Sequence, residues 1–271
     1  MSESRQKESL ASLFNISTGD EIQILTSPFD KGVILNGGKL GARFAPEVLL
    51  YELGKMQKTI HSEKNKIKIN SLIEDLPYSP NHKTLHLGGG HDTILSFVQH
   101  VMDSAQRPLL LINIDPHADM RTDEMIHSGT PMRQILELYD FPIHLIQIGN
   151  KDYANPASSF KEPLYKNPLS TVKRYHSLLD FNQTELMNSK QELNTPVIVL
   201  SLDCDVLDSN SAVSAPAHEG FSYQEIHSFI GWLKNHVDLK NMGIYEYNPL
   251  FDSLNNFHAR KIAALMHHYL F

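Results

Sequence analysis

The 271-residue sequence predicts an α/β fold built on a mainly parallel sheet, and three features of the chain lead to that prediction. Short, continuous apolar runs recur along it, as in parallel strands that are buried on both faces. Segments with apolar residues at helical spacing lie between these runs. Strand and helix alternate over most of the length without a linker or an internal repeat. We therefore expect a single domain over residues 1–271, with residues 1–20 as an N-terminal extension.

The predicted strands are apolar runs bounded by turn residues or proline. In chain order they cover Glu21–Leu25, Thr84–Leu87, Leu109–Ile114, His144–Ile148, Val197–Leu202 and Met242–Tyr245. The predicted helices carry apolar residues at helical spacing. They cover Ala45–Met56, Thr93–Met102, Thr130–Tyr139, Ser177–Asn188, Ser222–His236 and Arg260–Tyr269. A TIM barrel alternates strand and helix in the same way, and periodicity alone leaves that alternative open.

The composition limits the partners and the location that we expect. With 31 Asp and Glu against 24 Lys and Arg the net charge is −7, which argues against nucleic acid as a partner, because phosphate binding needs clustered cations. The single cysteine, Cys204, excludes an internal disulfide framework and suits a reducing cytoplasm. No apolar stretch has the length of a signal peptide or of a membrane span, so we expect a cytoplasmic protein with no membrane partner.

Residue types that bind metals follow several predicted strands at the point where each strand ends. They are His91 after three glycines, the Asp-x-His-x-Asp motif at 115–119, the Asp-x-Asp motif at 203–205, and Glu246. In an open α/β sheet, ligands bind in the crevice outside the carboxyl ends of the strands. We therefore expect these side chains to meet at one edge of the sheet.

The spacing within these motifs brings acidic and imidazole groups together. In an extended chain, residues i, i+2 and i+4 point the same way, so Asp115, His117 and Asp119 converge, as do Asp203 and Asp205. Such a concentration of carboxylates needs cations to neutralise it. Together with the imidazoles, these ligands exceed the needs of one tetrahedral zinc ion and suit a pair of divalent ions of the manganese type.

Asp115 and Asp203, which open the two motifs, are the predicted bridging ligands between the two ions. Two ions roughly 3.5–4 Å apart hold a bridging water and make it a hydroxide near neutral pH. The attack of such a hydroxide on a substrate is hydrolysis, so the pattern indicates a hydrolase.

Five motifs in the chain resemble those of the ureohydrolase family, which includes arginases, agmatinases and formimidoylglutamases. They are GGGHD (88–92), DPHADMR (115–121), HSGTP (127–131), SLDCDVLD (201–208) and EYNP (246–249). The motifs occur in the family's order, and the resemblance runs from about Phe29 to the C-terminus. It implies a three-layer α/β/α domain, arginase-like, with a mainly parallel sheet of about eight strands. It also disfavours the TIM barrel.

The resemblance implies a role for each motif residue. One Mn²⁺ would be held by His91, Asp115, Asp119 and Asp203, and a second by Asp115, His117, Asp203 and Asp205. His127 matches the histidine that shuttles protons in the family. Glu246 matches the carboxylate that pairs with the cationic amidine or guanidine group of the substrate. The family also implies a homo-oligomer, either a trimer or a hexamer.

Within the family, finer features resemble formimidoylglutamases. GGGH replaces the GGDH that is more usual in arginases and agmatinases, and Val213–Ala217 and Glu246–Asp252 resemble stretches of that subgroup. The implied reaction is the hydrolysis of N-formimidoyl-L-glutamate to L-glutamate and formamide, in histidine degradation. The two carboxylates of this small-molecule substrate need cationic or amide donors, for which Arg121, Arg133 and Asn155 are the candidates by position.

Three alternatives remain open. A guanidine hydrolase of the same family, acting on agmatine, arginine or a guanidino acid, would use the same metals and release urea. A two-metal phosphoesterase shares the Asp-x-His element, but GGGHD precedes that element here and no GDxxD follows it. A non-catalytic member of the family would have no need for two ions per chain.

Overall fold

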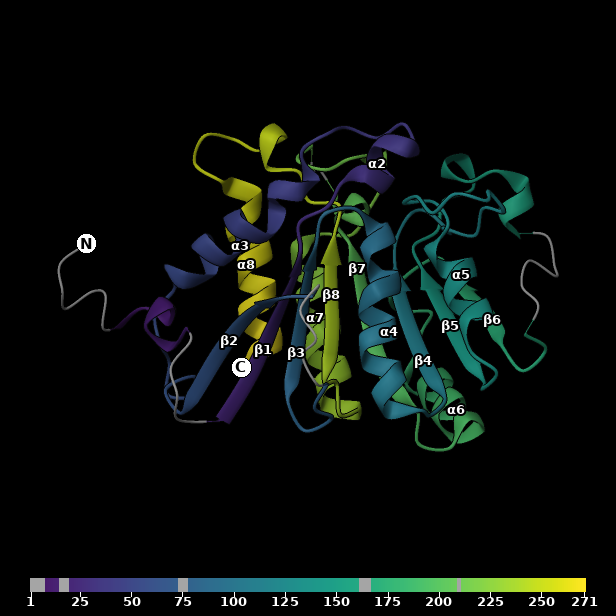
Figure 1. Cartoon of the computed structure of the whole chain (residues 1–271), viewed down its shortest axis with the longest axis horizontal. Coiled ribbons are helices and arrows are strands. Elements are labelled where there is room, and N and C mark those ends of the chain that lie inside the picture. Colours follow the sequence, from purple (N-terminus) through teal and green to yellow (C-terminus); the bar gives the residue numbers. More distant parts are fainter. Residues whose placement is uncertain (1–7, 15–19, 73–77, 161–166, 209–210) are drawn as a thin grey trace.

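The computed structural model describes residues 8–14, 20–72, 78–160, 167–208 and 211–271. Within them lies an eight-stranded sheet with the order β2-β1-β3-β8-β7-β4-β5-β6, in which every neighbouring pair is parallel (Figure 1). The strands are β1 (Asp20–Ser27), β2 (Asn65–Ser71), β3 (Lys83–Gly88), β4 (Leu109–Ile114), β5 (Ile143–Ile148), β6 (Thr171–Tyr175), β7 (Val197–Asp203) and β8 (Asn241–Tyr245). The sheet is open, with β2 and β6 at its edges, so the fold is the predicted three-layer domain and not a barrel.

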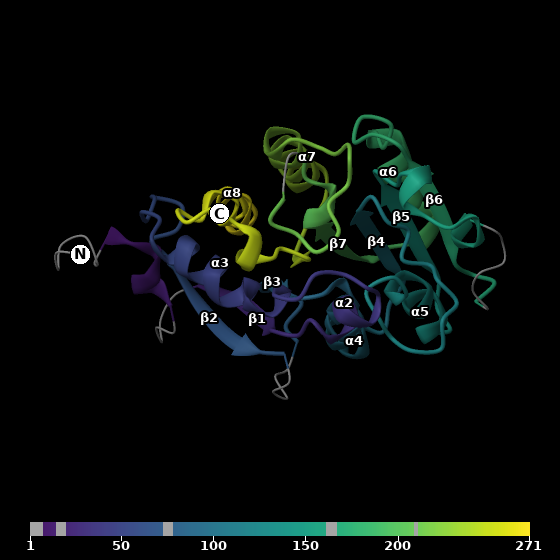
Figure 2. The ribbon, with the colours of Figure 1, turned by 90° about the horizontal axis from the view of Figure 1, so that it is seen from above.

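Helices cover both faces of the sheet (Figure 2). They are α2 (Lys31–Leu35), α3 (Ala45–Gly54), α4 (Ile94–Ala105), α5 (Pro131–Leu138), α6 (Gln183–Leu193), α7 (Tyr223–His236) and α8 (Phe257–Leu270). Apolar side chains of α3, α6, α7 and α8 form one core cluster with the sheet, and those of α4 and α5 form the other. The central strands β4, β5 and β7 are buried along their whole length, as expected of strands that are covered on both faces.

The structure differs from the predicted elements at three places. The edge strands β2 and β6 have no continuous apolar run, because they are mostly half-buried and carry lysines between their apolar residues. Helix α6 begins at Gln183 and not near Ser177, because the Asn182 side chain accepts hydrogen bonds from the first-turn N–H groups of Thr184 and Glu185. The five-residue helix α2 has no periodic pattern long enough to detect.

The register of the sheet aligns the carboxyl ends of its central strands. Ile244 of β8 lies opposite both Leu87 of β3 and Leu202 of β7, and Leu202 lies opposite Ile114 of β4. The residues that follow this row are therefore delivered to one edge of the sheet. All the motif residues that follow these strands belong to that edge.

Some expectations concern residues that the structure does not describe. Residues 1–7 and 15–19 of the expected N-terminal extension lie outside the described residues, whereas Leu10 and Leu13 of the same segment belong to the core. Residues 73–77, which precede β3, and residues 161–166, between β5 and β6, also lie outside the described residues. None of the helices in the described parts of the chain is both long and apolar enough to cross a membrane.

Candidate active site

A tight glycine turn places His91 at the carboxyl edge of the sheet. The N–H of Gly89 donates to the carbonyl of Ser27 at 2.9 Å, and the N–H of Gly90 donates to the carbonyl of Phe29 at 2.8 Å. A Cβ on Gly89 would collide with the carbonyl oxygen of Phe29, so this close approach requires glycine. The turn ends at His91, whose side chain is fully buried.

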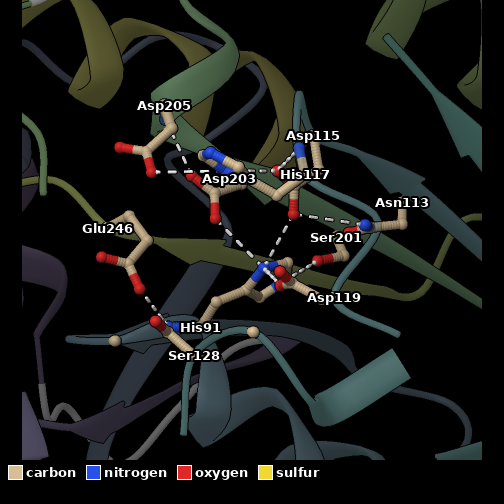
Figure 3. A network of polar contacts seen from close by, with 12 residues as sticks. His91, Asn113, Asp115, His117, Asp119, Ser128, Ser201, Asp203, Asp205 and Glu246 are labelled. Carbon is tan, nitrogen blue, oxygen red and sulfur yellow. Dashed lines mark hydrogen bonds and ion pairs between the residues drawn. The ribbon is translucent and has the colours of Figure 1, made fainter. Parts of the chain in front are cut away.

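Three carboxylates surround one nitrogen of the His91 ring (Figure 3). Its Nδ1 lies 2.8 Å from Oδ2 of Asp119 and 3.0 Å from Oδ2 of both Asp115 and Asp203. One potential ligand atom from each of these four buried residues lies within 4.8 Å of the others. The second ring nitrogen, Nε2, lies 2.9 Å from the Ser201 hydroxyl, which holds the ring with Nδ1 toward the carboxylates.

A second group lies on the other side of the same two aspartates. Nδ1 of His117 is 3.4 Å from Oδ1 of Asp115 and 3.7 Å from Oδ2 of Asp205. Oδ1 of Asp203 accepts the backbone N–H of Asp205 at 2.7 Å. Asp115 and Asp203 thus turn Oδ2 toward His91 and Oδ1 toward the His117 side, an arrangement compatible with bridging ligands.

The carboxylates and imidazoles of this cluster shift the pKa values of one another. Burial and the neighbouring Asp115 carboxylate raise the pKa of Asp203 to about 8. Burial by itself raises the pKa of Asp115, but hydrogen bonds to His117 and His91 outweigh it and hold that pKa well below its usual range. Burial by itself lowers the pKa of His117, but the carboxylates beside it raise that pKa to about 10. Buried carboxylates and imidazoles are a donor set that takes divalent first-row metals, so the residues fit a metal centre that neutralises the excess charge.

Two non-glycine residues of the site have a left-handed backbone. Asp119 has φ 51° and Glu246 has φ 62°. The carbonyl of Asp119 accepts the N–H of Met132 in the first turn of α5 at 3.1 Å, and the N–H of Glu246 donates to the carbonyl of Gly89 at 2.8 Å. Backbone strain of this kind persists where surrounding contacts hold it and is common at functional sites.

Glu246 is a buried carboxylate that accepts a hydrogen bond at only one of its two oxygens among the described residues. Its Oε1 accepts the backbone N–H of His91 at 2.7 Å, whereas Oε2 has no hydrogen-bond partner of acceptable geometry among the described residues. Burial and the nearby Asp205 carboxylate raise the pKa of Glu246 to about 8. A cationic ligand group at this carboxylate would favour its charged form.

The cluster forms the floor of a cavity of about 200 Å³. Its floor includes His117, Asp119, Asp203, Asp205 and Glu246. The rest of its lining comes from α2 and from the segments that follow the strands, and it includes Val33, Asn36, Gly37, Gly38, Arg121, Ser128, Gly129, Ala154, Asn155, Pro156, Ser159, Ser214 and Ala215. The cavity therefore joins metal-binding groups to a wall with a few polar side chains, as is typical of small-molecule sites.

The three predicted carboxylate-binding residues have different places in the structure. Arg121 lies in the pocket wall. Arg133 is not among the described residues that line it, and its guanidinium donates to the carbonyls of Arg121 and Asp123 and to Glu137. Asn155 does line the pocket, but its amide is bonded to the backbone of Ala118, Pro116 and Lys151. Arg133 and Asn155 thus support the loops that carry the site.

His127 is buried beside the pocket. Its Nε2 lies 2.9 Å from Oδ2 of Asp123, and its Nδ1 accepts the N–H of Gly129 at 3.1 Å. Of this loop's described residues, Ser128 and Gly129 line the cavity and His127 does not. Ser128 lies inside the HSGTP motif but carries no spacing signal of its own that would predict a place in the pocket.

The chain matches the family model described as "Arginase family" over residues 67–271. A formimidoylglutamase of Staphylococcus aureus (strain MRSA252) is 29% identical over 294 residues, which cover 97% of this chain and 90% of the relative. A formimidoylglutamase of Salmonella arizonae is 28% identical over 256 residues, which cover 86% of this chain and 79% of the relative.

Solved structures share the fold. Trypanosoma cruzi formiminoglutamase with Mn²⁺₂ aligns with a TM-score of 0.78 at 20% identity and covers 97% of each chain. Formimidoylglutamase from Bacillus subtilis aligns with a TM-score of 0.75 at 19% identity, over 97% of this chain and 90% of the other. Arginase from Bacillus subtilis aligns with a TM-score of 0.69 at 18% identity, over 93% of this chain and 98% of the other.

Proposed function

This chain belongs to the arginase family, and we propose on that premise that it hydrolyses N-formimidoyl-L-glutamate to L-glutamate and formamide. It is a hydrolase of that family with a buried His/Asp metal site. One observation carries the class of substrate: a carboxylate with a free oxygen, Glu246, and a guanidinium, Arg121, line the same cavity. The similarity to formimidoylglutamases favours the formimidoyl compound within that class. A substrate with a cationic amidine at one end and a carboxylate at the other matches these charges. This activity would belong to histidine degradation in the cytoplasm.

The proposed cofactor is a pair of Mn²⁺ ions per chain. The proposed ligands are His91, Asp115, Asp119 and Asp203 for one ion and Asp115, His117, Asp203 and Asp205 for the other. When bound, the pair would supply a water activated as a nucleophile near neutral pH and positive charge to offset the carboxylates. The His/Asp cluster and the manganese in the similar Trypanosoma cruzi structure support this proposal.

Glu246 is the proposed partner of the formimidoyl group. Its buried position excludes most water, and Oε2 is available to accept an N–H of the amidinium. The His91 N–H holds the other oxygen, so the carboxylate is oriented before the substrate arrives. This contact would place the trigonal formimidoyl carbon above the carboxylate cluster.

Proton transfer to the departing amine is assigned to His127. His127 is the proposed proton carrier, because its imidazole is paired with Asp123 and is buried next to the cavity.

A product assay tests the proposed activity. Manganese-loaded protein is offered N-formimidoyl-L-glutamate, arginine, agmatine and 4-guanidinobutyrate in separate reactions, and glutamate, formamide and urea are measured. We expect glutamate and formamide in equal amounts from the first compound alone. Urea from any guanidine, with no turnover of formimidoylglutamate, would overturn the proposed substrate.

A guanidino-acid hydrolase is the second candidate. Arg121 is the cation in the cavity wall among the described residues, whereas formimidoylglutamate brings two carboxylates. One guanidinium suffices for a substrate with one carboxylate, such as 4-guanidinobutyrate. The same guanidinium disfavours agmatine, because the ammonium of agmatine would face it. We also propose that the protein is a trimer or hexamer, which light scattering of the purified protein tests.

A further inference from the structure

Asn36 connects two polar side chains of the pocket wall. It follows the last residue of α2, and the cavity is lined by all three residues concerned. Its Oδ1 accepts a hydrogen bond from Nη1 of Arg121 at 2.6 Å, and its Nδ2 donates to Oγ of Ser128 at 3.1 Å. A guanidinium can only donate, so the amide oxygen has to face Arg121 and the amide nitrogen has to face Ser128.

These contacts leave donors that face no protein acceptor. Nε of Arg121 lies 2.7 Å from Oδ2 of Asp123, and Nη1 is bonded to Asn36. Within the described parts of the chain, no hydrogen bond involves Nη2, although the side chain lines the cavity. The Ser128 hydroxyl accepts from Asn36, so its own proton can be donated elsewhere. Arg121 and Ser128 together therefore offer a carboxylate a charged donor and a neutral donor.

Asn36 also fixes the Arg121 guanidinium at a different nitrogen from the one that Asp123 contacts. The Arg121 side chain is 44% exposed and that of Asp123 is 45% exposed, so neither is held by packing alone. Without Asn36, the remaining anchor of Arg121 is the Asp123 carboxylate, which competes with a substrate carboxylate for the same N–H groups. Two anchors at different nitrogens restrict the rotation of the guanidinium, and such preorganisation favours ligand binding.

We propose that Asn36 is a positioning residue that determines specificity for a substrate carboxylate, by holding Arg121 and Ser128 as a pair of donors. This inference rests on the proposed function only in taking the substrate to end in a carboxylate. Asn36 acts through Arg121 and Ser128 and contacts no reacting atom. Its removal therefore weakens substrate binding and leaves the chemical step nearly unchanged.

A double-mutant cycle tests the proposal with manganese-loaded protein and N-formimidoyl-L-glutamate. We expect Asn36→Ala to raise KM about tenfold while kcat stays within about threefold. Arg121→Ala should raise KM further, and Asn36→Ala should raise KM less in the Arg121→Ala background than in the wild type, because the part of its effect that passes through that guanidinium is then already lost. Asn65→Ala is the matched control, because Asn65 does not line the pocket. The Asn65 amide donates to the carbonyl of His61 at 2.9 Å, and the KM of this variant should equal that of the wild type.

Two results would overturn the proposal. One is an unchanged KM in Asn36→Ala. The other is a double variant whose rise in KM equals the product of the rises in the two single variants, because that result would mean that Asn36 and Arg121 act independently. Thermal melting of each variant shows whether it is folded, and Asn36→Asp provides a second substitution. Asp keeps the acceptor for Arg121 but adds a negative charge, so its KM should rise at least as much as that of Asn36→Ala.

The cycle separates this inference from the proposed function. If formimidoylglutamate is inert and 4-guanidinobutyrate yields urea, the proposed substrate is wrong, and the cycle run on 4-guanidinobutyrate decides the role of Asn36. If neither compound reacts, calorimetric titration with glutarate gives Kd values for the same variants. A wild-type protein that binds no glutarate would overturn the role of Asn36 as well.

Discussion

Lowering the pH from 8 to 5 should destabilise this protein through one buried histidine, His86. The ring lies in the centre of β3, fully buried, with Nδ1 2.9 Å from the Tyr245 hydroxyl and Nε2 2.9 Å from the Ser27 hydroxyl. It also stacks on Phe97 of α4, with ring centroids 4.9 Å apart. Burial lowers the pKa of His86 from 6.5 to about 3, and His100 adds to that effect.

The sign and the magnitude follow from this pKa. Between pH 6.5 and about 3 the unfolded chain binds a proton at His86 that the folded chain does not bind, so stability rises with pH across this window and is fully present above it. At pH 5 the unfolded ring is protonated 1.5 pH units below its pKa. At 1.36 kcal/mol per unit, this lowers the free energy of unfolding by about 2 kcal/mol relative to pH 8.

Urea unfolding of the wild type and of His86→Gln at pH 8 and pH 5 measures this effect. Both proteins are treated with EDTA, so that release of metal does not differ between them. The packing cost of glutamine is present at both pH values and cancels in the comparison. We expect the wild type to lose about 2 kcal/mol more than His86→Gln between the two pH values. An equal loss in both proteins would refute the reasoning, because it would mean that the folded ring takes up its proton near the ordinary pKa.

Three further predictions concern the site. EDTA treatment should abolish hydrolysis and Mn²⁺ should restore it. The Asp119→Ala variant should retain fewer metal ions per chain by elemental analysis, and full metal content in that variant would contradict the assignment of Asp119 as a ligand. Glu246→Gln should lower kcat/KM about 100-fold with unchanged metal content, because a charge-assisted contact is lost; activity near that of the wild type would remove Glu246 from the mechanism. His127→Ala should lower kcat about 100-fold because the proton carrier is lost, and a kcat near that of the wild type would remove His127 from the mechanism.

The metal cluster was predictable from the sequence because each contributing motif follows a buried strand. A parallel sheet collects the carboxyl ends of its strands at one edge, so the position of a residue just after an apolar run predicts where it lies. Asp115 after β4 and Asp203 after β7 illustrate this, because the two strands are neighbours in register. The edge strands β2 and β6 carried no such signal, since their half-buried residues alternate with charged ones.

The pocket wall was less predictable because loops form it. Arg121 and Arg133 are the same residue type on either side of one short loop, yet one faces the cavity and the other donates to backbone carbonyls of that loop. Asn36 is 85 residues from Arg121 in sequence and lies in a glycine-rich segment without periodicity. Such contacts depend on loop conformation, which strand and helix patterns do not determine.

The site combines two unfavourable features, buried carboxylates and left-handed backbone at residues with a side chain. Carboxylates are buried at the ends of β4 and β7, where burial without compensation is unfavourable. Asp119 and Glu246 adopt left-handed backbone conformations that cost free energy for residues with a side chain. The surrounding fold offsets these costs through the packed strands on either side, through a backbone hydrogen bond from α5 to Asp119, and through one from Glu246 to the turn after β3. These two unfavourable features occur together at the place where a bound cation would neutralise the carboxylates. Divalent cations should therefore stabilise the folded chain as well as enable its chemistry.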